Sequence, residues 1–203
     1  MTSQRHKTGS ASSGANGVVP AAILDATRAS VLAVGVRRTT LTDVARRAGV
    51  SRMTVYRLVP DMTALLFELM THDFSGLLVD AEAAAHRRRT ARGRITAVVV
   101  DVARRLPEEP LLRRVLDVDP DLLLPYLTER LGATQKVAVG HVRRMVLEGH
   151  ADKSVRRGDA DTIATALVVV VTSFVVSHRL FRGLAREDVL HELERMVDGW
   201  LRP

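Results

Sequence analysis

Apolar residues recur along most of this chain at intervals of three and four positions, the spacing that places side chains on one face of an α-helix. A sustained alternation of apolar and polar residues, which would indicate a half-buried β-strand, does not occur in the sequence. The pattern therefore predicts an all-α protein. The expected helices cover about residues 20–34, 41–48, 52–58, 61–85, 95–106, 111–116, 121–131, 134–148, 159–181 and 187–201.

Residues with strong positional preferences mark the ends of several expected helices. Pro20 suits the first position of a helix, because its ring fixes φ and its missing N–H is not needed there. Thr40 and Ser51 are expected to cap two short helices, since a hydroxyl oxygen accepts a hydrogen bond from a free backbone N–H. Gly35 and Gly149 are expected to end the helices that precede them.

The two short helices at 41–48 and 52–58 have the features of a helix-turn-helix. Ala45 is small enough for the helices to cross closely, and Gly49 suits a tight turn that needs positive φ. The apolar positions between the helices are Val44, Ala48, Val50, Val55 and Leu58. The opposite faces carry Thr42, Asp43, Arg46, Arg47, Arg52, Met53, Tyr56 and Arg57. This separation predicts a unit that packs on one side and binds DNA on the other.

The distribution of charge favours a nucleic-acid-binding module near the N-terminus. The chain has a formal net charge of +7. Residues 1–60 contain nine basic and two acidic side chains, whereas residues 61–203 contain 21 of each. A basic module joined to a neutral body is typical of proteins that bind a polyanion, and a solvated basic face is the alternative. Residues 1–19 are polar and rich in Gly and Ser, so we expect them to form a disordered arm.

A resemblance to the N-terminal domain of tetracycline-repressor-type (TetR) regulators lies in residues 23–59, ILDATRASVLAVGVRRTTLTDVARRAGVSRMTVYRLV. The matching residues are Ile23, Leu24, Ala26, Gly35, Thr39, Thr40, Val44, Ala45, Ala48, Gly49, Val50, Ser51, Thr54, Val55 and Tyr56. The resemblance implies a three-helix DNA-binding domain over residues 20–60 and a helical effector-binding and dimerisation domain over residues 61–203. It also implies a homodimeric repressor that a small apolar effector releases from a palindromic DNA operator.

Two positions soon after Tyr56, the last aromatic residue of this segment, depart from the family pattern. Val59 stands where an aromatic residue is common, and Met62 stands where a basic residue is common. Val59 still supplies an apolar plug, but the change at Met62 removes one expected contact to a phosphate. Asp61 remains suited to cap the following helix.

The second helix of a helix-turn-helix enters the major groove with its N-terminal residues toward the bases. Arg52 is therefore the expected bidentate contact to guanine, and Met53 and Thr54 are expected to touch base edges. Tyr56 and Arg57 are expected to position the protein on phosphates. The complete set of predicted DNA-binding residues is Thr40, Thr42, Ser51, Arg52, Met53, Thr54, Tyr56 and Arg57.

Two groups of residues in the C-terminal region are candidates for an effector pocket and a dimer interface. Larger side chains on different expected helices are candidates to line one cavity. They are Met70, Phe74, Tyr126, His141, Met145 and Phe174. The helix at 159–181 is apolar on more than one face, which favours contact with a second copy. The predicted interface residues are Val168, Val171, Val175, Leu193, Met196 and Trp200. An ordinary intramolecular core is the simpler interpretation of both groups.

No motif in the sequence indicates an enzyme, a metal site or a cofactor, and there is no cysteine for a thiolate site. Asp117, Asp119 and Asp121 mimic the start of a calcium loop, but Leu122 occupies the position that needs Gly. The apolar run at 163–176 is shorter than the ~20 residues of a membrane span. We expect a cytoplasmic regulator. An effector-independent DNA-binding regulator and a helical protein-interaction adaptor are the alternatives.

Overall fold

A computed structural model describes residues 18–123, 132–181 and 183–203, and within these ranges the chain contains helices and no strand. The expectation of an all-α protein is confirmed. The α-helices are α1 (Ala21–Val34), α2 (Leu41–Arg47), α3 (Arg52–Leu58), α4 (Met62–Ala85), α5 (Ala91–Arg105), α6 (Pro110–Val118), α8 (Ala133–Ala151), α9 (Ala160–Val176) and α10 (Arg186–Leu201). Short 3₁₀ helices lie at Leu106–Glu108, Pro120–Leu122 and His178–Phe181.

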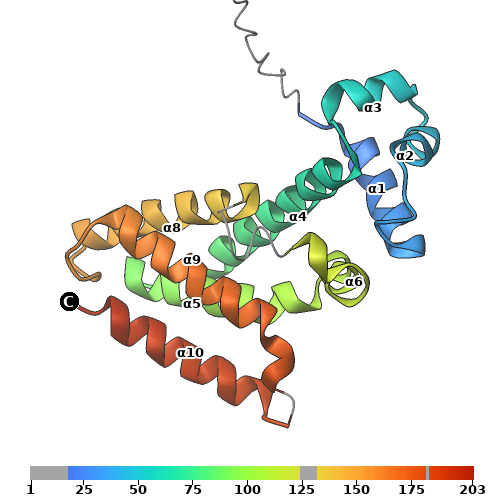
Figure 1. Ribbon diagram of the computed structural model, residues 1–203. Coiled ribbons are helices and arrows are strands. Elements are labelled where there is room, and N and C mark those ends of the chain that lie inside the picture. Colours follow the sequence, from blue (N-terminus) through green and yellow to red (C-terminus); the bar gives the residue numbers. More distant parts are fainter. Residues whose placement is uncertain (1–17, 124–131, 182) are drawn as a thin grey trace, which may run out of the picture.

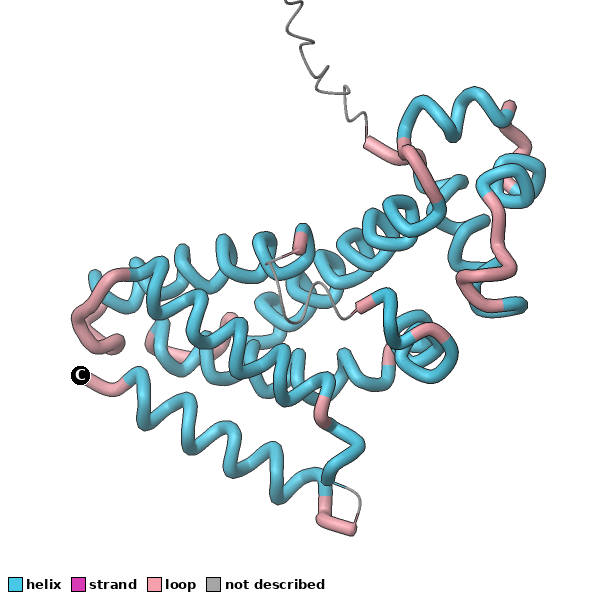
Figure 2. Tube along the Cα trace, in the orientation of Figure 1, coloured by secondary structure: helices cyan, strands magenta, loops and turns pink. Residues whose placement is uncertain are grey.

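The helices form two groups joined by α4, as Figure 1 shows. Helices α1, α2 and α3 form a small unit at one end of the molecule, and α4 runs from this unit into the larger body. In the body, α4 packs against α5 and α8, α9 packs against α8, and α10 packs against α5. Helix α6 lies at the near end of the body and contacts α1 (Figure 2).

Two hydrophobic cores hold these groups together, and α4 belongs to both. The first core combines α1–α3 with Leu65 and Leu69 of α4 and Val115 of α6. The second core, which we call the body core, combines the later turns of α4 with α5, α8, α9 and α10. By length and composition α4 would suffice to cross a bilayer, but its apolar side chains, such as Leu77, fill these cores. The helix therefore contributes to the packing of both parts.

The expected end of one helix at Gly149 is wrong, because α8 continues to Ala151. A Cβ atom at Gly149 would lie 2.2 Å from Val155 Cγ2, so glycine is needed here for close packing and not for a helix stop. The helix expected at 159–181 ends at Val176 and is followed by the 3₁₀ turn His178–Phe181.

Two further expectations fall mostly outside the described residues. Of the helix expected at 121–131, only its first residues are described, and they belong to the 3₁₀ turn Pro120–Leu122. The expected arm at 1–19 is described only from Val18 onward.

Candidate functional site

The short helices α2 and α3 are fixed by hydrogen bonds at their first turns. Thr40 Oγ1 accepts a hydrogen bond from the backbone N–H of Asp43 at 3.1 Å and donates one to Asp43 Oδ2 at 2.6 Å. Ser51 Oγ accepts from the backbone N–H of Thr54 at 3.1 Å. Helices of seven residues are unstable alone, so these caps and the packing beneath them define their ends.

The turn between the two helices has the geometry that the sequence predicts. Gly49 has φ of 69°, a left-handed conformation that side chains with a Cβ atom rarely adopt. Val44, Ala45 and Val55 are buried at no more than 1% exposure, so the apolar faces of α2 and α3 meet. The helix-turn-helix is confirmed as a packed unit.

The opposite side of α3 is exposed and basic. Met53 and Tyr56 are 68% and 51% exposed, and Arg52 and Arg57 are also exposed. Neither arginine forms an ion pair within the described residues. By contrast, Arg46 of α2 pairs with Asp43 at 2.9 Å.

The remaining predicted DNA contacts lie at the starts of α2 and α3. Thr40 and Ser51 are exposed, and Thr42 and Thr54 are half-buried. All eight predicted residues therefore lie on these two helices or their caps. Their arrangement leaves two cationic groups of α3 free to meet an anionic partner.

A buried carboxylate connects this domain to the body. Asp119 follows α6 and is 1% exposed. Its Oδ2 accepts a hydrogen bond from the backbone N–H of Val36 at 3.2 Å, and its Oδ1 lies 2.8 Å from Arg37 Nε. Exposed Asp121 lies 3.2 Å from Arg37 Nη2. From the sequence we interpreted these aspartates as a polar loop and helix start that do not form a calcium site. Their contacts with Val36 and Arg37 were not predicted, because a single sequence does not show which residues more than 80 positions apart are in contact.

A second ion-paired contact links α1 to α4. Arg28 donates to Asp73 Oδ1 at 2.5 Å and also contacts Asp25 at 2.7 Å. The hydrogen bond that Arg28 donates to Asp73 is the main reason that the pKa of Arg28 is raised above its ordinary value, although burial opposes the rise. The guanidinium therefore stays charged and neutralises Asp73.

A cavity of about 170 Å³ lies inside the body. Its walls are mainly hydrocarbon side chains. The lining residues are Phe67, Met70, Asp73, Phe74, Leu77, Leu78, Val98, Val99, Val102, Leu106, Glu109, Leu111, Leu112, Leu123, Gly132, Ala133, Thr134, Gln135, Ala138, Val142, Leu167, Val168, Val171, Thr172, Val175 and Val176. Of the predicted pocket residues, Met70 and Phe74 are among them.

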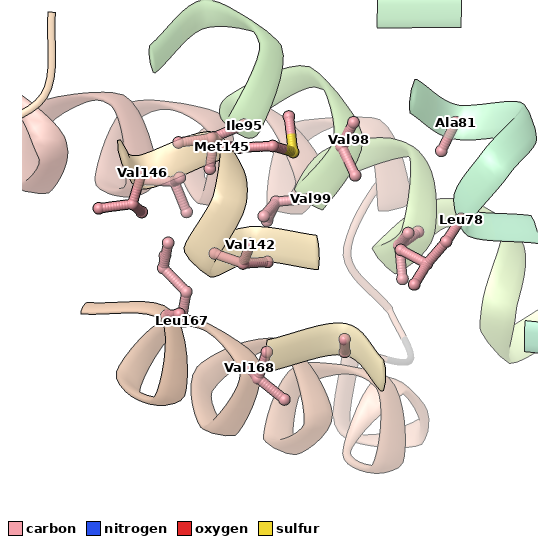
Figure 3. Packing of buried hydrophobic residues seen from close by; sticks show 14 of the residues in the cluster. Leu78, Ala81, Ile95, Val98, Val99, Val142, Met145, Val146, Leu167 and Val168 are labelled. Carbon is pink, nitrogen blue, oxygen red and sulfur yellow. The ribbon is translucent and has the colours of Figure 1, made fainter. Parts of the chain in front are cut away.

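Three of the other predicted pocket residues lie outside the cavity lining. Met145 is 2% exposed and packs beside Ile95 and Val98 in the body core (Figure 3), so it is used as a core residue. Half-buried His141 faces Glu82, with 3.4 Å between Nδ1 and Oε2. Phe174 lines a separate hollow with Phe181, and Tyr126 lies outside the described residues. Helical periodicity places a residue on a face but not in a particular cavity.

The predicted dimer residues divide into an inner and an outer set. Val168, Val175 and Leu193 are buried within the single chain. Half-buried Val171 lines the cavity together with Val168 and Val175. These four side chains therefore make contacts inside the chain. Met196 and Trp200 remain 64% and 40% exposed. The other exposed apolar residues of this region are Val169, Val170, Leu180 and Leu184. The sequence identified an apolar helix but not which of its faces points outward.

In the described part of the chain, no cluster of three or more His, Asp or Glu side chains has a geometry that would hold a metal ion.

Comparisons with known proteins agree with the geometry of the two domains. Residues 23–69 match the model of the family described as bacterial regulatory proteins, tetR family. HTH-type transcriptional regulators of Mycobacterium bovis and Mycobacterium tuberculosis are 32% identical over 180 residues, which cover 88% of this chain and 92% of theirs.

Solved structures share the fold at lower identity. The repressor QsdR of R. erythropolis has a TM-score of 0.68 at 18% identity, covering 89% of this chain and 94% of its own. The repressor AlkX of Dietzia, implicated in n-alkane biodegradation, has a TM-score of 0.67 at 18% identity, with 91% and 97% covered. The regulator FadR of Bacillus subtilis, in complex with stearoyl-CoA, has a TM-score of 0.61 at 13% identity, with 89% and 98% covered. Together with the helix-turn-helix and its basic face, these matches show that the chain belongs to the TetR family of DNA-binding transcriptional regulators.

Proposed function

We propose that this regulator is a cytoplasmic homodimeric repressor that binds a palindromic operator and is released from it by a small molecule in the body cavity. The observation that carries the proposal is the position of the cavity. It is lined by residues of α4 and α6, and both helices contact α1 of the DNA-binding domain. A molecule that enters the cavity therefore contacts the two helices against which that domain packs.

The exposed face of α3 supports the DNA-reading part of the proposal. Arg52 at the first turn contacts a guanine through its two terminal nitrogens, and Met53 and Thr54 touch neighbouring base edges. Tyr56 and Arg57, with the threonines at the start of α2, contact phosphates and set the register. Buried Val55 keeps these side chains outward by anchoring the other face of α3.

The exposed apolar side chains of α9 and α10 support dimerisation. Val169 and Val170 are 50% and 45% exposed, and Met196 and Trp200 project from α10. A second copy related by a twofold axis would remove these groups from water, and a twofold contact uses the same surface on both copies. Such a dimer places two α3 helices about 34–36 Å apart, one turn of the DNA groove.

The size of the cavity explains how a ligand would alter DNA binding. Its volume of about 170 Å³ is comparable with the ~150 Å³ of an engineered cavity that binds benzene, and is below the ~300–1,000 Å³ of pockets for drug-sized molecules. An effector larger than benzene must therefore displace the walls or extend beyond this volume.

Helix α6, which forms one wall of the cavity, is also connected to the DNA-binding domain. Leu111 and Leu112 of α6 line the cavity, and Asp119 directly after α6 holds Val36 and Arg37. A shift of α6 would therefore move the loop between α1 and α2, and the two copies of α3 would no longer match the groove together.

The test begins with an operator selected from a random pool of DNA duplexes. Apolar and cationic compounds are then screened by thermal shift and by release of the labelled operator. An effector is expected to weaken operator binding by about 5–150-fold, and the operator must weaken effector binding by the same factor.

Ala138→Phe provides the cavity control, because buried Ala138 lines the cavity from α8, away from the DNA-binding domain. The variant should bind the operator and lose the response to the compound. A compound that releases this variant as readily as the wild type acts elsewhere. If no compound shifts operator binding, an effector-independent regulator is the better description.

A further inference from the structure

The charged residues that are described in the lining of the cavity are all acidic. Among the described lining residues there are two carboxylates, Asp73 and Glu109, and no Lys, Arg or His. Asp73 is already neutralised by Arg28, which donates to it at 2.5 Å. Glu109 is half-buried, and its carboxylate has no hydrogen bond or ion pair with the part of the chain that the structure describes. Among the described lining residues there is therefore one negative charge without a partner.

The local contacts explain why Glu109 remains unpaired. It occupies the N-cap position of α6, but its side chain does not cap the helix. The neighbouring cations bind the preceding residue instead: Arg113 lies 3.1 Å from Glu108 Oε2, and Arg186 also pairs with Glu108. Glu109 thus keeps its charge available at the cavity.

The apolar surroundings of the Glu109 carboxylate make it favour cationic over anionic ligands. Phe67, Leu111 and Leu112 are among the hydrocarbon groups that line the same space. A carboxylate beside such groups is less well solvated than in water, so an opposite charge is attracted more strongly and a like charge is repelled more strongly. An anionic ligand would meet this repulsion without a described counter-ion in the lining.

We propose that the effector is a cationic amphiphile, with an apolar body that fills the cavity and a positively charged nitrogen that pairs with Glu109. This proposal rests on the effector role of the cavity and adds the chemical class of the ligand. Thr134 and Thr172 supply uncharged polar groups in the lining for further hydrogen bonds.

The test uses three compounds that share one apolar skeleton and differ in charge: 4-phenylbutylamine, 4-phenylbutanol and 4-phenylbutyrate. Their affinities for the full chain are measured by calorimetry at neutral pH, and release of the selected operator is measured in parallel. The amine is expected to bind about tenfold more tightly than the alcohol, which is the gain from one charge-assisted hydrogen bond, and the acid should bind most weakly.

Two matched variants locate the charge that produces this order. Glu109→Gln should reduce the affinity for the amine to that of the alcohol and leave the alcohol unchanged. Glu68→Gln removes an exposed carboxylate of α4 that lies outside the lining and has no ion pair among the described residues, so this variant should preserve the preference for the amine.

Several results would overturn the proposal. Equal or tighter binding of the acid, an unchanged affinity of Glu109→Gln for the amine, or a lack of binding by all three compounds would each do so. If the acid binds and releases the operator, the effector role of the cavity stands and only the charge class is wrong.

Discussion

The arginines of α5 and those of α2 and α3 are used in opposite ways. All four arginines of α5 have carboxylate partners: Arg92 with Asp198, Arg94 with Glu148, Arg104 with Glu187, and Arg105 with Asp80 and Asp101. On α2 and α3, only Arg46 has such a partner within the described residues. Arg47, Arg52 and Arg57 are exposed and unpaired there.

This difference shows how one residue type serves cohesion in one region and recognition in the other. An arginine that is paired inside the protein must give up its carboxylate before it can bind a phosphate. An arginine that is solvated needs only to release water and allow the DNA to release its counter-ions. Residues 61–203 contain as many acidic as basic side chains, whereas residues 1–60 contain two acidic and nine basic ones. This difference in the supply of carboxylates separates structural from DNA-binding arginines.

The largest effect is expected where the two regions meet. Asp119→Ala leaves the backbone N–H of Val36 without its acceptor and Arg37 without its buried partner. The free energy of unfolding should fall by about 2–3 kcal/mol, and operator affinity should fall with it. Urea denaturation and fluorescence anisotropy would measure both quantities.

Asp121→Ala is the control for this prediction. Asp121 also contacts Arg37, but both side chains are about 70% exposed, so the loss should be less than about 0.5 kcal/mol. Equal effects of the two variants would contradict a special role for the buried carboxylate.

Arg52→Ala tests whether an unpaired arginine of α3 reads a base. The variant should lose about 1–3 kcal/mol of operator affinity and relax the preference at one base pair. Stability should be unchanged, because the side chain has no described partner to lose. A set of operators with single substitutions would reveal the relaxed position, and an equal loss on operator and scrambled DNA would exclude a base contact.

Arg57→Ala tests the phosphate role through its salt dependence. Binding to specific and scrambled duplexes should weaken alike, and the slope of log K against log salt should become shallower by about one unit. Arg104→Ala removes an arginine that pairs with Glu187 in the body, and should leave the slope unchanged. A change of slope in both variants would remove the distinction between the two kinds of arginine.

The smallest effect is expected from an ion pair within the body. Burial raises the pKa of Glu82, but the hydrogen bond and charge of Arg144 and the nearby His141 outweigh it, so the pKa is lower than the ordinary 4.5. Since the folded state holds this proton less tightly, the contribution is present above 4.5 and is lost as the pH falls through the folded value.

Glu82→Gln should therefore lower the free energy of unfolding at pH 7 by about 0.5 kcal/mol, a modest value because Arg144 is half exposed. The difference from wild type should shrink on acidification, as urea denaturation across a pH series would show. Exposed Glu68 on the same helix has no ion pair among the described residues, so Glu68→Gln should leave the free energy of unfolding at pH 7 nearly unchanged. If the difference in free energy of unfolding between Glu82→Gln and wild type grows on acidification, the predicted direction of the pH dependence is wrong.

The local parts of the structure could be predicted from the sequence, because their causes lie within a few residues. Thr40 and Ser51 cap helices through bonds to residues three positions later, and Gly49 adopts its turn conformation for reasons within its own backbone. Most helices of the body were likewise predicted from periodicity.

The relations between distant segments could not be predicted in this way. The bond from Val36 to Asp119 joins residues 83 positions apart, and the choice of Met70 over Met145 for the cavity depends on how five helices pack. The apolar pattern of α9 likewise does not tell Val168, which is buried, from Val169, which is exposed.

The sharing of α4 and α6 between the two regions limits how this regulator can be rebuilt. A chimera that places residues 1–60 on another body would carry the recognition helix, but would leave behind Leu65, Leu69 and Val115, which complete its hydrophobic core. It would also leave behind Asp119, the acceptor for Val36. The smallest unit that can be grafted with its fold intact is therefore assembled from separate stretches of the chain, and a new operator specificity is more safely introduced by exchanging only the exposed side chains of α3.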